Sequence, residues 1–409
     1  MPKFLRCCLG SSSFSQSFFV LGWREEKDYE ERERFIDPVR KLGHDLCSRR
    51  LTYPALKSKH ERMYPPEISR GWFRLSLMAV SLGFATQLSV VGKTGGGGTS
   101  SGMLLVANKG DHTLSLIDPV AGKEIATIPE DGVTGHEVIA SPDGRFAYVP
   151  IFGNSGVGRP GTDGQLIRVM DLAKRQVVAT VDFGKGVRPH CALIHPTNGR
   201  LYVTTEVARS VSIIDPKTLA IVGSVPTGDA QSHMLAISHD GRRGYTANVG
   251  SGTVSVLDLE ANTLLMTIPV ATLVQRISIS KDDRWVFTAD QTKPRLMVID
   301  TKTNQVSTSI PLPGLAYGTA CTPDGRSLVV ALIGLNKVGR VDLATMKLVE
   351  TLDLPKSPEF VLIRPDGAVA YVSCGASKQV AAIDLKHWKV EKLIEAGKGA
   401  DGLAWAAGR

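Results

Sequence analysis

Short apolar and β-branched runs recur at regular intervals along residues 103–409, separated by turn residues. Each interval contains an apolar residue followed by aspartate, and these pairs are Ile117-Asp118, Met170-Asp171, Ile214-Asp215, Leu257-Asp258, Ile299-Asp300, Val341-Asp342 and Ile383-Asp384. Successive aspartates are 53, 44, 43, 42, 42 and 42 residues apart. A second marker keeps the same step: a tight turn such as Asp240-Gly241, followed by a β-rich run such as 244–247. Asp-Gly turns suit hairpins because both positions tolerate positive φ.

Each repeat contains four β-rich segments, which predict one blade of a β-propeller. One segment precedes the Asp-Gly turn, one follows it, one ends in the marker aspartate, and a fourth lies beyond, as at 176–181. The first repeat begins at a second strand, 103–107, and the chain ends with an unmatched inner strand, 402–405. Pairing these two strands would complete a seventh blade and remove the open sheet edges. We predict an all-β fold, a single closed seven-bladed β-propeller over residues 103–409.

The strand after the tight turn resembles the tetrapeptide of the YVTN-repeat β-propellers. The matching segments are Tyr202-Val203-Thr204-Thr205, Tyr245-Thr246-Ala247-Asn248 and Tyr371-Val372-Ser373-Cys374. The resemblance covers residues 103–409 and implies the fold. It implies no single activity, because the relatives include extracytoplasmic binding proteins, surface-layer-like proteins, lactonases, lyases and haem-d1 propellers.

The first hundred residues lack the repeat. We expect residues 1–62 to be disordered or an over-extended gene model. Residues 63–87 place Arg70 and Arg74 before an apolar run, 75–85, that ends in small residues. This is the plan of a secretory signal peptide, and the run is short for a membrane span. Residues 88–102 predict a Gly/Ser-rich linker. We therefore expect a periplasmic or secreted propeller with no stable membrane span in the mature chain.

The formal net charge of +8 does not indicate a nucleic-acid partner. Residues 1–100 contribute +6 of it, so the predicted propeller is nearly neutral. A nucleic-acid binder carries its excess charge on the folded part. The six cysteines are scattered without a C-x-x-C pair, which gives no disulfide framework and no Cys₄ zinc site.

One polar or amphipathic residue per blade falls where the inner strand begins. These seven channel-mouth residues are His136, His190, His233, Gln275, Tyr317, Glu359 and Asp401. Inner strands surround the central channel, so we expect these side chains to ring one mouth of it, on the top face. Three imidazoles from adjacent blades would suit Zn²⁺, Mn²⁺ or Fe²⁺, with Glu359 or Asp401 as a ligand or base. Alternatively, the histidines pack between blades and hydrogen-bond backbone carbonyls.

Other residues are expected on the same face. Arg188, Gln231 and Arg276 add donors, and a cationic rim would suit an anionic or sugar-like ligand. For Arg188 and Gln231 we favour the alternative that they are ordinary solvated loop residues. The first interval is longer by about ten residues, which lie at 152–164 and predict a mobile flap over the mouth, with Arg159 and Asp163 as ligand contacts.

Two further histidines and three cysteines suggest no chemistry. His195 and His239 fall in hairpin turns, where we expect them to be exposed. Cys191, Cys321 and Cys374 lie in predicted strands, as buried thiols do.

Three functions remain open. The first is an exported module that binds a small molecule, glycan or protein at the top face. The second is a metal-dependent lactonase- or lyase-like enzyme at the same mouth, with His136, His190 and His233 as ligands and Glu359 as the candidate base. The third is a redox propeller like the haem-d1 proteins. Imidazoles that converge on one point would favour the enzyme, and splayed imidazoles would favour the binding module. The sequence assures no cofactor, and a divalent metal ion is the one that the histidines suggest.

Overall fold

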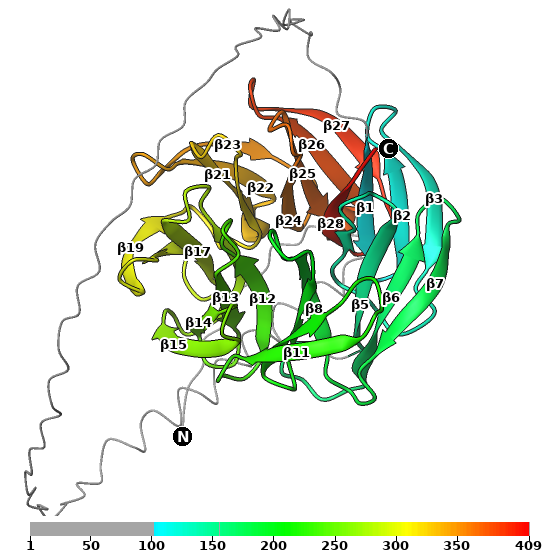
Figure 1. Cartoon of the computed structure of the whole chain (residues 1–409). Coiled ribbons are helices and arrows are strands. Elements are labelled where there is room, and N and C mark those ends of the chain that lie inside the picture. The colour runs from blue at the N-terminus through cyan, green and yellow to red at the C-terminus, as the bar shows by residue number, and fades with distance from the viewer. Residues whose placement is uncertain (1–101, 155, 409) are drawn as a thin grey trace, which may run out of the picture. The chain divides into compact units, whose positions relative to one another are not determined.

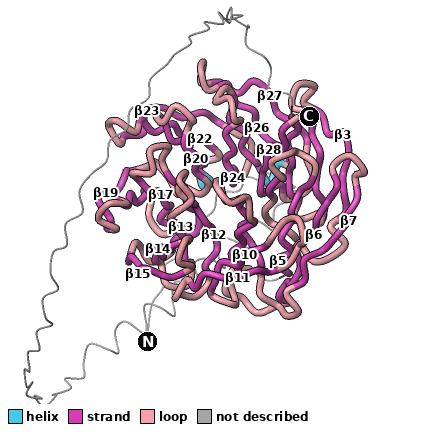
Figure 2. The backbone as a smooth tube through the Cα atoms, viewed as in Figure 1, coloured by secondary structure: helices cyan, strands magenta, loops and turns pink. Residues whose placement is uncertain are grey.

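The computed structural model describes residues 102–154 and 156–408. The predictions for residues 1–62, for the signal-peptide-like segment 63–87 and for nearly all of the linker lie outside the described residues. Within them, twenty-eight β-strands form seven four-stranded antiparallel sheets. Figure 1 shows these sheets as blades around a central axis, and Figure 2 shows how little of the described chain is helical. The predicted seven-bladed β-propeller is therefore confirmed.

The blades are numbered here from the one that closes the ring. Blade 1 contains β28 (Ala400–Ala407), β1 (Gly102–Asn108), β2 (Thr113–Asp118) and β3 (Lys123–Pro129). Blade 2 contains β4 (Ile139–Ala140), β5 (Phe146–Gly153), β6 (Asp163–Asp171) and β7 (Gln176–Asp182). Blade 3 contains β8 (Pro189–Ile194), β9 (Leu201–Thr205), β10 (Ser210–Ile214) and β11 (Ile221–Pro226). Blade 4 contains β12 (Ser232–Ile237), β13 (Arg243–Asn248), β14 (Thr253–Asp258) and β15 (Thr263–Pro269).

The remaining three blades follow the same order. Blade 5 contains β16 (Val274–Ile279), β17 (Trp285–Asp290), β18 (Arg295–Asp300) and β19 (Gln305–Pro311). Blade 6 contains β20 (Thr319–Cys321), β21 (Ser327–Leu332), β22 (Lys337–Asp342) and β23 (Lys347–Asp353). Blade 7 contains β24 (Pro358–Ile363), β25 (Val369–Cys374), β26 (Gln379–Asp384) and β27 (Lys389–Glu395). Two short 3₁₀ turns, η1 (Ile333–Leu335) and η2 (Gly375–Ser377), follow β21 and β25.

The two ends of the propeller meet in blade 1. β28 pairs antiparallel with β1, with Leu104 opposite Trp405 and Val106 opposite Leu403. The predicted closing strand 402–405 is extended to Ala400–Ala407, and the predicted second strand 103–107 is extended to Gly102–Asn108. The last strand of the chain thus occupies the innermost position beside the first, and the ring has no open edge there.

The repeated aspartates and turns have a local physical cause. The Asp258 carboxylate accepts the backbone N–H groups of Glu260 and Ala261, at 3.0 and 2.9 Å, and so closes the turn between β14 and β15. In the hairpin between β12 and β13, the Asp240 carboxylate accepts the N–H of Arg242 at 2.9 Å, while Gly241 has φ 76°. Short polar side chains that bond their own backbone favour such turns.

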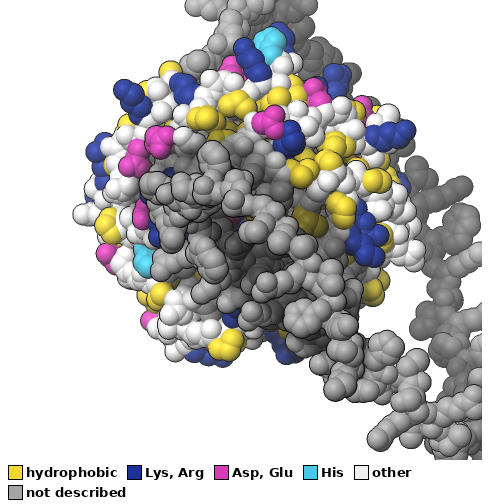
Figure 3. Space-filling view, turned by 180° about the vertical axis from the view of Figure 1, so that it is seen from behind, with side chains coloured by type: hydrophobic (Ala, Val, Ile, Leu, Met, Phe, Trp, Pro, Cys, Tyr) yellow, Lys and Arg dark blue, Asp and Glu magenta, His cyan; other side chains and the backbone are white. Residues whose placement is uncertain are grey.

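Apolar side chains pack between adjacent blades, and the outermost strands face water. One core cluster joins blades 3 and 4 through Tyr202, Met234 and Tyr245. In β3, by contrast, Ile128 is the one fully buried side chain. In the view from behind, both basic and acidic side chains are scattered over the visible described surface (Figure 3), which agrees with the nearly neutral charge of residues 101–409. Among the described residues, no helix has the length and apolar character to cross a membrane.

β-bulges at the start of the inner strands set up the channel mouth. In blade 3 the pairing of β8 with β9 shifts between Pro189 and Ala192, and in blade 5 that of β16 with β17 shifts between Val274 and Ile277. Blades 1, 4 and 7 contain the same shift at the same place. The extra residue leaves the ladder and changes the direction of its side chain.

Candidate functional site

The structure places the seven predicted channel-mouth residues at equivalent positions. Five of them are the second residue of an inner strand: His190, His233, Gln275, Glu359 and Asp401. His136 lies three residues before β4, and Tyr317 lies two residues before β20. The register that the repeat predicted is therefore present in all seven blades.

Three histidines form one contact group, called here the imidazole cluster. The ring centroids of His136 and His190 lie 5.4 Å apart, and those of His190 and His233 lie 3.6 Å apart with a tilt of 31°. Phe152 meets His190 edge-on at 5.3 Å, and Gln275 Nε2 lies 3.2 Å from His233 Nε2. His190 and His233 are 1% exposed, whereas the side chain of His136 is 20% exposed and lies nearer to solvent.

Several ring nitrogens in this cluster are buried without a hydrogen-bond partner. They are Nδ1 and Nε2 of His190 and Nδ1 of His233. Burial is the largest cause that lowers the pKa of both residues well below the ordinary value, and at His190 the nearby backbone of His233 opposes the shift. Burial likewise lowers the pKa of His136 to about 4, against the opposing effect of Asp401. The imidazoles are therefore uncharged at neutral pH, and each offers one N–H and one lone pair.

Five charged residues form a second group, called here the channel network. The Arg276 guanidinium donates to the carboxylates of Glu137 and Asp401, the latter at 2.9 Å. The Lys109 ammonium donates to Glu359 at 2.9 Å and to Asp401 at 3.2 Å. Arg276, Glu137 and Asp401 are almost fully buried, while the side chain of Lys109 is 34% exposed. Asp401 is the shared acceptor that joins the two halves of the network.

The channel network spans the central channel. Arg276 comes from blade 5, whereas Glu137 and Asp401 come from blades 2 and 1. Each of those blades is three places away around a ring of seven, which is the largest separation the ring allows. The guanidinium also contacts the rings of Tyr317 at 4.8 Å and Phe360 at 5.5 Å. The side chain of Arg276 therefore lies across the channel at this level.

Burial and pairing set the protonation of the network. Burial raises the pKa of Glu137 to about 7, although Arg276 opposes the shift. Burial also raises the pKa of Glu359, against Lys109. For Asp401, Lys109 and Arg276 outweigh the effect of burial and hold the pKa well below its usual range. The pKa of Lys109 is raised because Asp401 and Glu359 outweigh the effect of burial. The Asp401 carboxylate is thus deprotonated and negatively charged at neutral pH.

The geometry of the imidazole cluster bears on the predicted metal site. His190 and His233 pack ring against ring. Within residues 102–154 and 156–408, no group of three or more His, Cys, Asp or Glu side chains is arranged so that it could hold a metal ion. Metal ligation by His136, His190 and His233 stays a prediction, and it requires that these rings turn.

The predicted cationic rim does not form, because its two arginines, Arg188 and Arg276, are buried and paired with carboxylates of the protein itself. The Arg188 guanidinium donates to the Asp163 carboxylate at 2.5 Å and to the backbone carbonyl of Arg159 at 2.5 Å. Both acceptors belong to the predicted flap, which therefore is tied to blade 3. Gly158 packs on the Gln231 amide, so closely that an added Cβ would lie 2.3 Å from Nε2. Arg276 is committed to the channel network.

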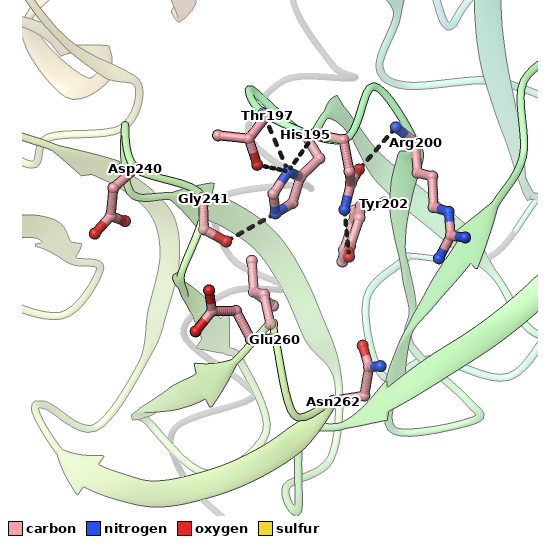
Figure 4. A pocket seen from close by; sticks show the side chains of 10 residues that line it. His195, Thr197, Arg200, Tyr202, Asp240, Gly241, Glu260 and Asn262 are labelled. Atoms are coloured by element: carbon pink, nitrogen blue, oxygen red, sulfur yellow. Dashed lines mark hydrogen bonds between the residues drawn. The ribbon is translucent and has the colours of Figure 1, made fainter. Parts of the chain in front are cut away.

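His195 departs from the prediction that it is exposed. It is 4% exposed, and its Nε2 lies 2.7 Å from the Gly241 carbonyl of the next blade. Its Nδ1 accepts the N–H groups of Thr197 and Asn198, both at 3.3 Å. Figure 4 shows this ring beside a cavity of about 320 Å³. His239 is exposed, as expected.

The cavity beside His195 lies at the far ends of the inner strands from the channel mouth. A second cavity, of about 390 Å³, lies beside Asp290, Lys293 and Arg295. Neither cavity is lined by a channel-mouth residue. Of the three predicted buried thiols, Cys191 and Cys374 are buried and Cys321 is partly exposed.

Three residues of the site were not found from the sequence. Glu137 directly follows the channel-mouth residue His136, just as Arg276 directly follows Gln275. In blade 5, Arg276 lies within the bulge between Val274 and Ile277. Because Glu137 directly follows a predicted channel-mouth residue, the sequence contained a signal that could have identified it. Lys109 lies in the turn after β1, and Phe152 lies near the end of β5. No repeat position singles out these two residues.

Fold and site define a seven-bladed β-propeller with a buried ionic network across its channel. The chain belongs to the family described as "Domain of unknown function (DUF5074)", which matches residues 171–379. The solved structures similar to it include Kuenenia stuttgartiensis hydrazine synthase, with 20% identity and a TM-score of 0.60 over 69% of this chain and 92% of that one. They also include the dihydro-haem d1 dehydrogenase NirN in complex with DHE, with 15% identity and a TM-score of 0.55 over 74% of each chain.

At these identities the likeness to the two structures is one of fold. No curated protein matches the sequence. The resemblance to YVTN repeats stays a prediction.

Proposed function

We propose that this chain is an exported binding protein that takes a small ligand at the channel mouth, against the imidazole cluster. One observation carries the proposal: three ring nitrogens of His190 and His233 are buried without partners. Most buried polar atoms in proteins have a hydrogen-bond partner, and an unpaired one costs about 1–3 kcal/mol. A ligand that pairs with these nitrogens recovers that free energy.

The channel network supports a ligand that enters and leaves by the top face. Arg276 crosses the channel between blade 5 and blades 1 and 2, which narrows the path through the ring. His136 and Lys109 are the partly exposed members at this face. A small molecule, or one residue of a glycan or protein, fits this position better than a broad partner surface.

The test is a thermal-shift screen of the full chain, expressed without a histidine tag, against cations, neutral sugars and alcohols, organic anions and metal ions. His190→Phe retains an aromatic ring without nitrogens. His239→Gln is the matched control, because His239 is exposed and follows the end of β12 that is opposite to His233. We expect at least one ligand to stabilise wild type and His239→Gln but not His190→Phe. Equal stabilisation of all three proteins by every ligand that shifts them would contradict the proposal.

A metal-dependent lactonase- or lyase-like enzyme is the second candidate. The uncharged state of the three imidazoles favours it, because neutral imidazole is the form that ligates metals. Glu359, with a raised pKa, is its candidate base. One equivalent of Zn²⁺, Mn²⁺ or Fe²⁺ per chain, lost in His190→Phe, would support this reading. A redox function like that of the haem-d1 propellers would instead give a purified protein that absorbs visible light.

The proposed export of the protein is tested by finding where the expressed protein accumulates and where its N-terminus lies. Expression of the full reading frame should yield a mature protein in the periplasm or medium, and its N-terminus should lie close to residue 86 by mass spectrometry. Retention of residues 63–85 in an exported or cytoplasmic protein would overturn the signal-peptide prediction.

A further inference from the structure

The cavity of about 390 Å³ lies between blades 4 and 5, beside the channel mouth. Its blade-4 wall is formed by the turn 251–252 and by the segment 269–272, and its blade-5 wall is the turn between β17 and β18. Asp290, at the start of that turn, pairs across the sheet with Val274, which directly precedes the channel-mouth residue Gln275. The cavity therefore opens on the top face, outward from the mouth.

The described side chains that line this cavity carry more positive than negative charge. Lys293 and Arg295 are cations, and Asp290 is the single carboxylate among them. The cavity of about 320 Å³ has the opposite composition, with one arginine and two carboxylates among its described lining residues. The two cavities are similar in size, so their charge distinguishes them. The cavity between blades 4 and 5 favours an anion.

The Asp290 carboxylate is engaged by hydrogen bonds from the protein itself. Asp290 is 1% exposed. Its Oδ1 accepts the backbone N–H groups of Thr292 and Lys293, at 2.9 and 3.2 Å, and the Thr292 hydroxyl at 2.7 Å. Its Oδ2 accepts the Nε–H of Arg295 at 2.9 Å. The buried carboxylate thus holds the guanidinium by its Nε and leaves both Nη groups for other acceptors.

Three donor groups of this cavity have no acceptor within residues 102–154 and 156–408. They are the Nη groups of Arg295, the ammonium of Lys293 and the hydroxyl of Thr272. The side chain of Arg295 is 33% exposed, so it is open to a ligand from solvent. Guanidinium and ammonium groups form short, charge-assisted hydrogen bonds with phosphate and carboxylate oxygens. The cavity thus combines positive charge with available donors.

Blade 5 departs from the repeat at this place. In blade 4 the last residue of the second strand, Asn248, donates through Nδ2 to the first residue of the third strand, Thr253, at 3.0 Å. Blade 1 has an asparagine and a threonine at the same two positions, 3.1 Å apart. In blade 5 the two positions hold Asp290 and Arg295. A buried ion pair is often no more stable than uncharged groups in its place, so the fold does not require this exchange. The exchange does place a guanidinium at the cavity.

We propose that this cavity binds a tetrahedral oxyanion, the phosphate or sulfate group of a small molecule or glycan. The guanidinium fork of Arg295 pairs with two of its oxygens, and Lys293 and Thr272 donate to the others. A carboxylate has only two oxygens for the same donors. An amine or a metal cation would meet two protein cations and a carboxylate that is already engaged. The site does not include the imidazole cluster, so the inference goes beyond the proposed function and does not depend on it.

The experiment titrates the full chain by calorimetry with inorganic phosphate, sulfate, acetate and tetramethylammonium, at pH 7.5 and constant ionic strength. We expect phosphate and sulfate to bind, acetate to bind at least tenfold more weakly, and tetramethylammonium not to bind. The tighter of the first two identifies the anionic group of the ligand. Acetate binding as tight as that of phosphate and sulfate, or no binding of either, would overturn the inference.

A pair of charge-matched variants locates the binding. Lys293→Gln removes one positive charge from an exposed residue of the cavity, and Lys302→Gln removes the same charge from an exposed position beyond the other end of β18. We expect the dissociation constant of phosphate to rise about tenfold in Lys293→Gln, from the loss of a short-range Coulomb attraction, and to stay unchanged in Lys302→Gln. Equal affinities of these two variants would overturn the inference.

A third variant tests the guanidinium fork separately from its charge. Arg295→Lys retains the positive charge, but an ammonium group is a point charge without the planar fork. We expect the dissociation constant of phosphate to rise about fivefold, from the loss of the paired hydrogen bonds. A dissociation constant equal to that of wild type would overturn the assignment of Arg295 as the residue that binds the anion.

Discussion

Replacing His190 by phenylalanine should make the ligand-free propeller more stable. His190 is 1% exposed, and neither of its ring nitrogens has a hydrogen-bond partner. Its neighbours are the rings of His136, Phe152 and His233, at centroid distances of 5.4, 5.3 and 3.6 Å. A phenyl ring can retain these aromatic contacts and brings no polar atoms into the buried site.

The magnitude follows from two opposing effects. Each buried unpaired polar atom costs about 1–3 kcal/mol, so removing two should stabilise the protein by about 4 kcal/mol. The six-membered ring is larger than imidazole, and overpacking a core costs about 1–3 kcal/mol. The expected net result is an increase of about 2 kcal/mol in the free energy of unfolding. Binding at the mouth should be lost in the same variant, as in other cases where a functional site is less stable than it could be.

The assay is equilibrium urea denaturation of the full chain at pH 7.5, where histidines of the unfolded chain are also mostly neutral. His195→Phe is the matched control, because His195 is 4% exposed but bonds Gly241 at 2.7 Å and accepts two N–H groups. We expect that control to lose about 3 kcal/mol, from the broken bonds and from the carbonyl left unpaired. If His190→Phe were destabilised as much as His195→Phe, the nitrogens of His190 would have partners, and the argument for a ligand would fail.

Three further perturbations test the network, a buried carboxyl group and the ring. Arg276→Met leaves the carboxylates of Glu137 and Asp401 buried without their cation, so we expect a loss of about 4 kcal/mol at pH 8. The loss should be smaller at pH 5, where the carboxylates take up protons, and equal losses in urea titrations at both pH values would contradict the network. Glu206 lies just after β9, and burial, opposed by Arg188, raises its pKa to about 7. The folded state therefore holds this proton more tightly than the unfolded chain, and stability falls as the pH rises from about 4.5 to 7. Glu206→Gln should accordingly raise the free energy of unfolding by about 2 kcal/mol at pH 8 and leave it nearly unchanged at pH 5; a gain of the same size at both pH values would contradict the shifted pKa. Deleting residues 400–409 removes β28 and exposes the edge of β1, so size-exclusion chromatography should show aggregation; a monomeric protein that unfolds cooperatively would contradict ring closure in blade 1.

The fold could be predicted from the sequence because its turns depend on local chemistry. Asp258 binds the backbone N–H groups of Glu260 and Ala261, two and three residues ahead. Such a bond involves only neighbours in the chain, so the same residue type recurs in every blade and the period is visible. Ring closure could be predicted for a related reason: the missing inner strand at one end and the spare one at the other can both be counted along the chain.

The site could be predicted only in part. The repeat placed His136, His190 and His233 correctly at the channel mouth, because their positions follow from the blade period. It could not show which partners meet across the axis, since the contact of Arg276 with Glu137 joins residues from opposite sides of the ring. The error on His195 has the same origin, because its partner, Gly241, lies in the neighbouring blade.

The chemistry of the mouth arises where the blades differ from one another. Blades 2, 3 and 4 each contribute a neutral histidine to one side of the mouth, where blade 2 also contributes Glu137. Blades 1 and 7 contribute Asp401 and Glu359 to the other side of the mouth. The Lys109 ammonium binds both of these carboxylates. A closed ring of paired strands holds the backbone of each of these positions in place. The repeat therefore supplies the frame, and the departures from the repeat supply a mouth with unpaired ring nitrogens on one side and a buried ionic network on the other.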